Sequence, residues 1–264
     1  MKKVSVIIPC FNQGKYVKDA IESVLNQTYK NIEIICVNDG SSDNSSEILS
    51  QIKNITFIDL KENKGVINAR NLAIDNCSGD YILPLDADDL IETTYIEKAV
   101  EILNNKPEIG IVYCRAKFFG QKTGEWHLPE FNPEDFIYAN CIFNCALFRK
   151  DDFYRAGKYK ENMKDGCEDW DLWLSFIELN LKPYRIDEIL FNYRQYQNTR
   201  TTSANKSTEW KKSLIGNHIE LYLSHNSFIE KVFTPKIELK EKLKKSKKLK
   251  KIFKLLSIST FLKY

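Results

Sequence analysis

Short apolar runs alternate with segments of helical periodicity through the first half of the chain. The apolar runs predict strands at Val4–Ile8, Ile32–Val37, Ile55–Leu60, Tyr81–Leu85 and Ile109–Phe118. Apolar residues at three- and four-residue spacing predict helices at Tyr16–Leu25, Ser45–Ile52, Val66–Asn76 and Thr94–Leu103. Strands that are apolar throughout and alternate with helices are typical of a parallel sheet covered on both faces. The first half therefore predicts a doubly wound α/β fold.

The pattern is less regular after Phe119. Residues 120–133 read as a loop, Cys145–Phe148 and Ile189–Tyr193 as strands, and Glu168–Leu179 and residues 209–225 as helices. The chain contains no internal repeat and no Gly/Ser-rich linker. We therefore expect the second half to extend the same domain.

The composition is that of an ordinary globular protein, with 43% hydrophobic and 28% charged residues. No apolar run approaches the roughly 18 residues of a membrane-spanning helix. The first apolar run ends at Pro9 and is too short for the core of a signal peptide, so we expect a cytoplasmic protein. Seven cysteines without a Cys-x-x-Cys pair disfavour a disulfide framework or a zinc site.

The charge is distributed unevenly along the chain. Residues 236–264 contain 11 Lys and 2 Glu, a formal charge of +9, whereas residues 1–235 carry −6. An acidic globule with a basic tail is unlike a nucleic-acid binder. Residues 240–254 can form a basic amphipathic helix, which predicts attachment to an anionic membrane surface. The alternative is a helix that packs on the globule or on a partner, with its lysines merely solvated.

Three carboxylates follow the predicted strand Tyr81–Leu85, at Asp86, Asp88 and Asp89. Ligands of open parallel sheets bind beyond the carboxyl ends of the strands. Carboxylate oxygens suit Mg²⁺ or Mn²⁺, and Asp86 and Asp88 would project the same way if the chain stays extended. This position favours a metal site over the alternative, a solvated acidic turn that caps the next helix.

Other polar residues are ambiguous on their own. Asp39 lies in a turn and could instead accept a hydrogen bond from the imide of uracil. Arg70 could pair with a diphosphate or be a surface charge. Asp169 lies in the acidic first turn of a predicted helix, where the helix dipole stabilises negatively charged side chains. Beside Trp170, it would also suit a general base acting on a sugar. The dinucleotide fingerprint, the P-loop and a Ser-His-Asp pattern are absent from the sequence.

Taken together and in order, these clusters resemble family 2 glycosyltransferases of the GT-A fold. The resemblance covers about residues 3–195 and is most specific in the first hundred. It is carried by the runs Val4–Asn12, Ser23–Tyr29, Val37–Asp43, Asn63–Asn71, Gly79–Asp89 and Glu168–Trp173. Family members near this pattern often have Tyr-Arg-x-His where this chain has Tyr193-Arg194-Gln195-Tyr196.

The resemblance implies a GT-A type α/β fold with a mostly parallel central sheet flanked by helices and a basic helical C-terminal extension. Residues 1–120 would form the nucleotide-sugar half, residues 121–225 the acceptor half, and residues 226–264 the tail. Asp88 would bind Mn²⁺ or Mg²⁺ and Asp169 would be the catalytic base. The nucleotide-sugar site would contain Pro9, Phe11, Asn12, Asp39, Arg70, Asp86 and Ala87.

The implied activity is an inverting, metal-dependent transfer of a hexosyl or N-acetylhexosaminyl group from a UDP-sugar. The acceptor would be a glycan or a polyprenol-linked glycan in surface polysaccharide synthesis, with the enzyme attached to the inner face of the cell membrane. A sugar nucleotidyltransferase would share the sheet and the metal, but should carry a Gly- and Arg-rich loop where this chain has Pro9-Cys10-Phe11-Asn12. A catalytically silent nucleotide-sugar-binding module is the other alternative, against which the presence of both Asp88 and Asp169 counts.

Overall fold

The computed structural model describes residues 1–196 and 209–225 of the 264. The chain divides into two compact units, Met1–His218 and Ile219–Tyr264. Of the second unit, the described part contains the short helix α10 (Ile219–Ser224). The predicted basic helix over residues 240–254 lies outside the described residues.

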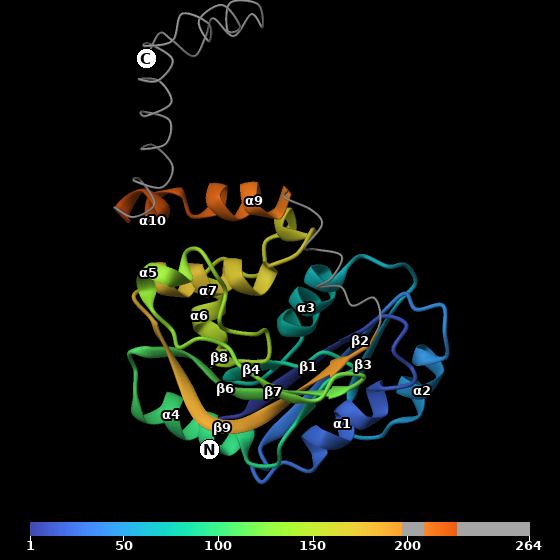
Figure 1. Cartoon of the computed structure of the whole chain (residues 1–264). Helices are drawn as coiled ribbons and strands as arrows, with labels where there is room; N and C mark the ends of the chain where they lie inside the picture. The colour runs from blue at the N-terminus through green and yellow to red at the C-terminus, as the bar shows by residue number, and fades with distance from the viewer. Residues whose placement is uncertain (197–208, 226–264) are drawn as a thin grey trace, which may run out of the picture. The chain divides into compact units, whose positions relative to one another are not determined.

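The first unit is built on one mixed sheet (Figure 1). Within the described residues its nine strands are β1 (Val4–Cys10), β2 (Ile32–Asp39), β3 (Thr56–Leu60), β4 (Tyr81–Pro84), β5 (Leu90–Ile91), β6 (Ile109–Gly120), β7 (Gly124–Trp126), β8 (Leu147–Arg149) and β9 (Lys182–Gln195). The strand order is β3-β2-β1-β4-β8-β6-β9-β5, and β7 pairs with β6.

The parallel part that the sequence predicts is β3-β2-β1-β4. Beyond it, β8 pairs antiparallel with both β4 and β6, whereas β6 and β9 are parallel. Every residue of β1 is buried, which explains its uninterrupted apolar run. The pairing of β1 with β4 ends at Ile7. Pro9, which has no N–H to donate, therefore lies beyond the segment paired with β4, and its neighbour on the other side is Val37 of β2.

Helices cover both faces of the sheet (Figure 1). One face carries α3, α6 and α7, and the other carries α1, α2 and α4. In the described part of the first unit the helices are α1 (Val17–Leu25), α2 (Ser45–Gln51), α3 (Val66–Asp75), α4 (Tyr95–Asn105), α5 (Pro133–Phe136), α6 (Lys150–Arg155), α7 (Glu168–Glu178) and α9 (Glu209–Asn217), with a 3₁₀ turn at Glu161–Met163.

The region after Phe119 contains more structure than its sequence predicts. The expected loop over residues 120–133 includes β7, and the expected strand Ile189–Tyr193 is the end of the longer β9. Strand β7 pairs antiparallel with β6, with Trp126 opposite Ala116. Its three residues are too few to show a strand period, which is why the sequence pattern missed them.

Aromatic packing fixes α7 against the sheet. The ring of Phe148 in β8 lies 5.7 Å from the rings of both Trp173 and Phe176 in α7. The indole N–H of Trp173 also donates to the backbone oxygen of Ile142 at 3.2 Å. Buried rings in edge-to-face contact add to the stabilisation from apolar burial. These contacts therefore hold the middle of α7 against the sheet.

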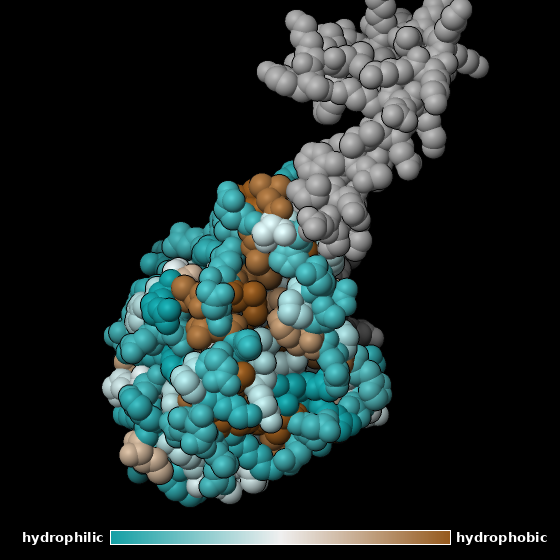
Figure 2. All heavy atoms as spheres, turned by 90° about the vertical axis from the view of Figure 1, so that its left-hand side faces the viewer, coloured by the Kyte–Doolittle hydropathy of each residue, from teal (hydrophilic) through white to brown (hydrophobic). Residues whose placement is uncertain are grey.

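On the side shown in Figure 2, the surface is largely hydrophilic, with hydrophobic side chains exposed in patches. No helix in the described ranges is long and apolar enough to span a membrane.

Candidate active site

The loop that follows β1 is tied to the loop that follows β2. Asn12 has a left-handed backbone conformation (φ 54°), and its Oδ1 accepts a hydrogen bond from the backbone N of Ser42 at 2.8 Å. Its own backbone N donates to Ser41 Oγ at 2.9 Å. The neighbouring Phe11 is 46% exposed, which is unusual for a phenylalanine beside a buried strand. The two loops thus form one edge that presents an open aromatic ring.

Asp39, at the end of β2, is 2% exposed. Its Oδ1 accepts from the backbone N of Lys64 at 2.7 Å, and its Oδ2 accepts from the backbone N of Gly65 at 2.8 Å. Gly65 has φ +87° and directly precedes α3. Asp39 therefore orders the turn into the helix that carries Arg70. Each carboxylate oxygen keeps further acceptor capacity.

Arg70 joins two carboxylates that are far apart in sequence. Its side chain is 2% exposed, and it donates to Asp86 Oδ1 at 2.6 Å and to Glu168 Oε1 at 2.7 Å. Burial alone would lower the pKa of Arg70, but the charges of Asp86 and Glu168 outweigh it and raise the pKa. The guanidinium also lies 5.6 Å from the ring centre of Tyr159. Arg70 thus fixes the segment after β4 beside the first turn of α7.

The Asp86–Asp89 segment turns rather than remaining extended. The backbone N of Asp89 donates to the backbone oxygen of Asp86 at 3.1 Å, and Ala87 in the turn is 2% exposed. The extended chain on which the predicted common direction of Asp86 and Asp88 depends is therefore not present. Asp86 reaches Arg70, whereas Asp88 Oδ2 accepts a hydrogen bond from the hydroxyl of Tyr196 at 2.7 Å.

Arg194, at the end of β9, forms hydrogen bonds with the Asp86–Asp89 turn. Arg194 donates from its Nε to the backbone oxygen of Asp88 at 2.7 Å, and from its backbone N to Asp89 Oδ1 at 2.8 Å. Burial, and then the charge of Asp86, raises the pKa of Asp88. Burial also raises the pKa of Asp89, with the charges of Asp88 and Asp86 adding to it. The turn therefore holds three acidic side chains close together, two of which are costly to ionise because they are buried.

The three acids in the first turn of α7 have different environments. Glu168 is 5% exposed and bound to Arg70. Asp171 is 0% exposed. Its Oδ1 lies 3.1 Å from His218 Nε2 and 2.6 Å from Asn217 Nδ2, and its Oδ2 lies 3.1 Å from Lys160 Nζ. Asp169 is partly exposed, and its Oδ1 accepts from the backbone N of Trp170 at 2.7 Å. Of the three, Asp169 is the one that solvent reaches most readily.

The donor set near Asp88 is compatible with a divalent cation. No group of three or more His, Cys, Asp or Glu side chains able to hold a metal occurs in residues 1–196 and 209–225. Mg²⁺, however, is commonly held by one or two carboxylates together with substrate phosphates and water. Asp88, with Asp86 nearby, supplies hard oxygen ligands of this kind, and their mutual repulsion is what a cation would relieve. The residues present therefore fit such an ion.

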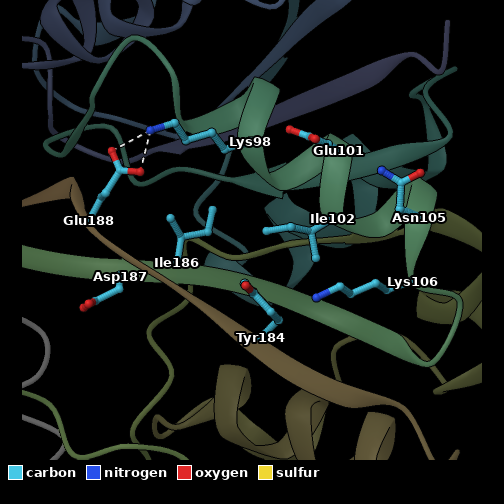
Figure 3. Close-up of a pocket in the computed structure, with 9 residues that line it drawn as sticks. All are labelled: Lys98, Glu101, Ile102, Asn105, Lys106, Tyr184, Ile186, Asp187 and Glu188. Atoms are coloured by element: carbon cyan, nitrogen blue, oxygen red, sulfur yellow. Dashed lines mark hydrogen bonds and ion pairs between the residues drawn. The ribbon is translucent and has the colours of Figure 1, made fainter.

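The site residues that the sequence predicts fall into two groups. Arg70 and Asp86 meet in the Arg70 bridge, Ala87 and Asp88 follow Asp86 in its turn, and Asp169 follows Glu168 in α7. Pro9, Phe11, Asn12 and Asp39 lie at the ends of β1 and β2. A cavity of about 420 Å³ between α4 and the first part of β9 is lined by none of them (Figure 3). It contains the Lys98–Glu188 ion pair and Lys106 over the ring of Tyr184.

Sequence reasoning did not assign roles to Tyr159, Gln13 or Tyr196, and it did not identify Glu168 as the partner of Arg70. Nothing in the local sequence pairs Glu168 with Arg70, because the two residues are 98 positions apart. Tyr196 occupies the place of the histidine in the Tyr-Arg-x-His pattern, which was a visible signal. Nothing in the sequence marks Tyr159 or Gln13, because their contacts join segments that are distant along the chain.

Comparison with solved structures establishes the type of fold. S. aureus TarS, crystallised in complex with UDP, matches with a TM-score of 0.68 at 19% identity, over 85% of this chain and 66% of TarS. The mannosyltransferase PcManGT of Pyrobaculum calidifontis, in complex with GDP-Man and Mn²⁺, matches with a TM-score of 0.60 at 16% identity, over 86% of this chain and 72% of its own. The predicted GT-A transferase fold is thus confirmed.

Sequence relatives point the same way. An uncharacterised glycosyltransferase of Rickettsia typhi is 36% identical over 227 residues, which is 79% of this chain and 69% of that protein. The putative teichuronic acid biosynthesis glycosyltransferase TuaG of Bacillus subtilis is 30% identical over 223 residues, which is 80% of this chain and 85% of TuaG. The model of "Glycosyl transferase family 2" matches residues 5–168, more than half of the chain. The predicted family is therefore confirmed, and the chain belongs to glycosyltransferase family 2.

Proposed function

We propose that this glycosyltransferase transfers a hexosyl or N-acetylhexosaminyl group from a UDP-sugar to a hydroxyl of a glycan or polyprenol-linked acceptor, with inversion at the anomeric carbon. The observation that carries the proposal is the Arg70 bridge. It brings Asp86, from the end of β4, and Glu168, from the start of α7, to one guanidinium. This bridge supports the proposal because Asp86 is expected to meet the donor, and Asp169, expected to activate the acceptor, directly follows Glu168 in sequence.

In this proposal the nucleotide lies along the ends of β1 and β2. Phe11 offers an exposed ring against which a base can stack, and Pro9 and Asn12 shape the edge beside it. Asp39 would receive the imide N–H of uracil through its remaining acceptor capacity. Arg70 and Ala87 would border the diphosphate and ribose together with Asp86. Residues 1–120 would then form the donor half and residues 121–225 the acceptor half.

Asp88 and Asp86 would hold Mg²⁺ or Mn²⁺ with the diphosphate. A cation bound there supplies the positive charge that makes the nucleoside diphosphate a better leaving group. Asp169 would take the proton of the acceptor hydroxyl as that oxygen forms its bond to the anomeric carbon. The bond from that carbon to the phosphate oxygen breaks, and its electron pair leaves with UDP. One displacement from the opposite face inverts the configuration.

The exposure of the three acids supports the choice of Asp169 as the base. Glu168 and Asp171 are buried and paired with cationic side chains, so neither can approach an acceptor without losing its partner. Asp169 is partly exposed on the same helical turn. An acid–base group has to come within hydrogen-bond reach of the proton that it transfers.

Calorimetric titration with UDP tests the donor and the cation together, with GDP and dTDP for comparison. We expect UDP to bind in Mn²⁺, and affinity to fall sharply in EDTA and in Asp88→Ala. Equal UDP affinity in the three samples would contradict the cation assignment, and tighter binding of GDP or dTDP would contradict the choice of base. A sugar nucleotidyltransferase would instead consume a nucleoside triphosphate and release pyrophosphate.

We further propose a role in surface polysaccharide synthesis at the inner face of the cell membrane. The name of TuaG and the basic composition of residues 236–264 support it. Each lysine near an anionic surface contributes about 1 kcal/mol to binding, so several lysines together can hold an enzyme at a lipid-linked acceptor. The vesicle experiment described in the Discussion tests this part separately.

A further inference from the structure

The hydroxyl of Tyr196 connects the loop after β1 to the carboxylate of Asp88. It lies 2.7 Å from Asp88 Oδ2 and 3.0 Å from Gln13 Nε2. The amide nitrogen of Gln13 can only donate, and an ionised carboxylate can only accept. The single hydroxyl proton of Tyr196 is therefore directed to Asp88, while its oxygen accepts from Gln13. Within the described residues, no other side chain donates a hydrogen bond to the Asp88 carboxylate.

The ring of Tyr196 is fixed by its neighbours. It stacks on Tyr16 with 6.1 Å between ring centres and an angle of 16° between planes. Tyr16 in turn lies 4.3 Å below the guanidinium of Arg194, which binds the backbone oxygen of Asp88. The phenol is thus positioned by packing as well as by its two hydrogen bonds, and it presents its proton to one oxygen of Asp88.

Gln13 connects Tyr196 to the loop after β1. It directly follows Phe11 and Asn12, and its backbone N donates to Ser45 Oγ at the start of α2 at 3.1 Å. A shift of the loop after β1 would therefore move the amide that holds Tyr196. Such a shift would be passed to Asp88 through one intervening side chain.

We infer that Tyr196 is a positioning residue for Asp88 and that Gln13, through Tyr196, couples the loop after β1 to the orientation of that carboxylate. The inference rests on the proposed function, in which this loop meets the nucleotide and Asp88 holds the cation. Hydrogen bonds to a metal-binding carboxylate fix its orientation, and their loss typically weakens metal binding by about 10–100-fold. The hydrogen bond from Tyr196 goes to Oδ2 of Asp88, so it does not occupy the other carboxylate oxygen, Oδ1.

Calorimetric titration of the full-length protein with UDP, in Mn²⁺ and in EDTA, tests the inference. Tyr196→Phe keeps the ring that stacks on Tyr16 and removes only the hydroxyl. We expect it to weaken UDP binding by about 10–100-fold in Mn²⁺ and by less than about twofold in EDTA. Tyr16→Phe, which also removes one phenol hydroxyl and keeps the stacked ring, is the matched control and should bind as the wild type does.

Gln13→Leu and the double variant test the coupling. Gln13→Leu should weaken binding in Mn²⁺ less than Tyr196→Phe, and the double variant should be no weaker than Tyr196→Phe, because both changes act through one contact. Additive losses would overturn the coupling through Tyr196.

Other outcomes separate this inference from the proposed function. An unchanged affinity for Tyr196→Phe, or an equal loss in Mn²⁺ and EDTA, would overturn the positioning role and leave the proposed donor standing. Wild-type UDP binding that is independent of the cation would overturn both the positioning role and the cation assignment, but not the nucleotide site. Failure of the wild type to bind UDP under either condition would overturn the proposed donor and this inference together.

Discussion

Replacing Arg70 with methionine should destabilise the protein strongly because it removes the buried guanidinium that pairs with the buried carboxylate of Glu168. The side chains of Arg70 and Glu168 are 2% and 7% exposed. Removing one partner of a buried ion pair costs about 3–5 kcal/mol. The contact with Asp86 adds at most about 1 kcal/mol, since that carboxylate is 39% exposed and solvent screens it.

Urea and thermal unfolding followed by circular dichroism measure this loss. In a unit of this size 1 kcal/mol shifts the midpoint by about 2–4 °C, so Arg70→Met should lower Tm by about 6–20 °C. The double variant Arg70→Met/Glu168→Met should recover much of the loss, because apolar side chains can replace a buried pair. Asp86→Asn, which keeps the cation and its buried partner, is the control and should lose about 1 kcal/mol or less.

Two results would refute this reasoning. A loss below about 1 kcal/mol for Arg70→Met would mean that Glu168 finds another partner or water when the cation is removed. A double variant less stable than Arg70→Met alone would mean that Glu168 stabilises the fold without Arg70. Either result would weaken the claim that Arg70 fixes the end of β4 beside α7.

Three further predictions concern other parts of the chain. Asp169→Asn should lower the transfer rate about 10²–10⁴-fold while UDP affinity, measured by calorimetry, stays within about twofold; wild-type turnover would exclude Asp169 as the base. Burial alone would lower the pKa of His218, but the hydrogen bonds that its ring donates to Asp171 and Glu178 outweigh burial and raise that pKa. The stabilisation from protonated His218 is therefore full below about pH 6.5 and is lost as pH rises through the higher folded-state pKa. The difference in free energy of unfolding between the wild type and His218→Phe, measured in urea, should therefore shrink with rising pH. A difference that grows with pH would contradict a raised pKa for His218. Replacing the lysines at 244, 245, 247 and 248 with glutamine should weaken co-sedimentation with anionic vesicles at low salt, and equal binding of both proteins would remove the tail from the membrane proposal.

The first half of the fold could be predicted from the sequence because its signals are local. The buried strand β1 reads as an apolar run, and the Asp86–Asp89 cluster follows β4 directly, so the position of these acids at a strand end could be read from the order of residues. The antiparallel insertion of β8 between β4 and β6 could not, since pairing partners across the sheet leave no periodic trace in a short strand.

The roles of the acidic residues depended on contacts that no local pattern encodes. Glu168, Asp169 and Asp171 look equivalent in the sequence, but Glu168 meets Arg70 from 98 positions away, and Asp171 meets His218 from 47 positions away. The turn at Ala87 and the hydrogen bond from the hydroxyl of Tyr196 to Asp88 likewise cannot be read from the local sequence. Tertiary partners, rather than spacing, separate a structural acid from one that is available for chemistry.

Release of nucleotide from the sugar donor tests the central claim most directly. The full-length protein is incubated with UDP-, GDP- and dTDP-hexoses and N-acetylhexosamines in Mn²⁺ or EDTA, and free nucleoside diphosphate is quantified for the wild type, Asp88→Asn and the exposed control Asp151→Asn. We predict release of UDP by the wild type and by Asp151→Asn in Mn²⁺, with none in EDTA or from Asp88→Asn. Release by Asp88→Asn at the wild-type rate, or no release from any donor, would contradict the account.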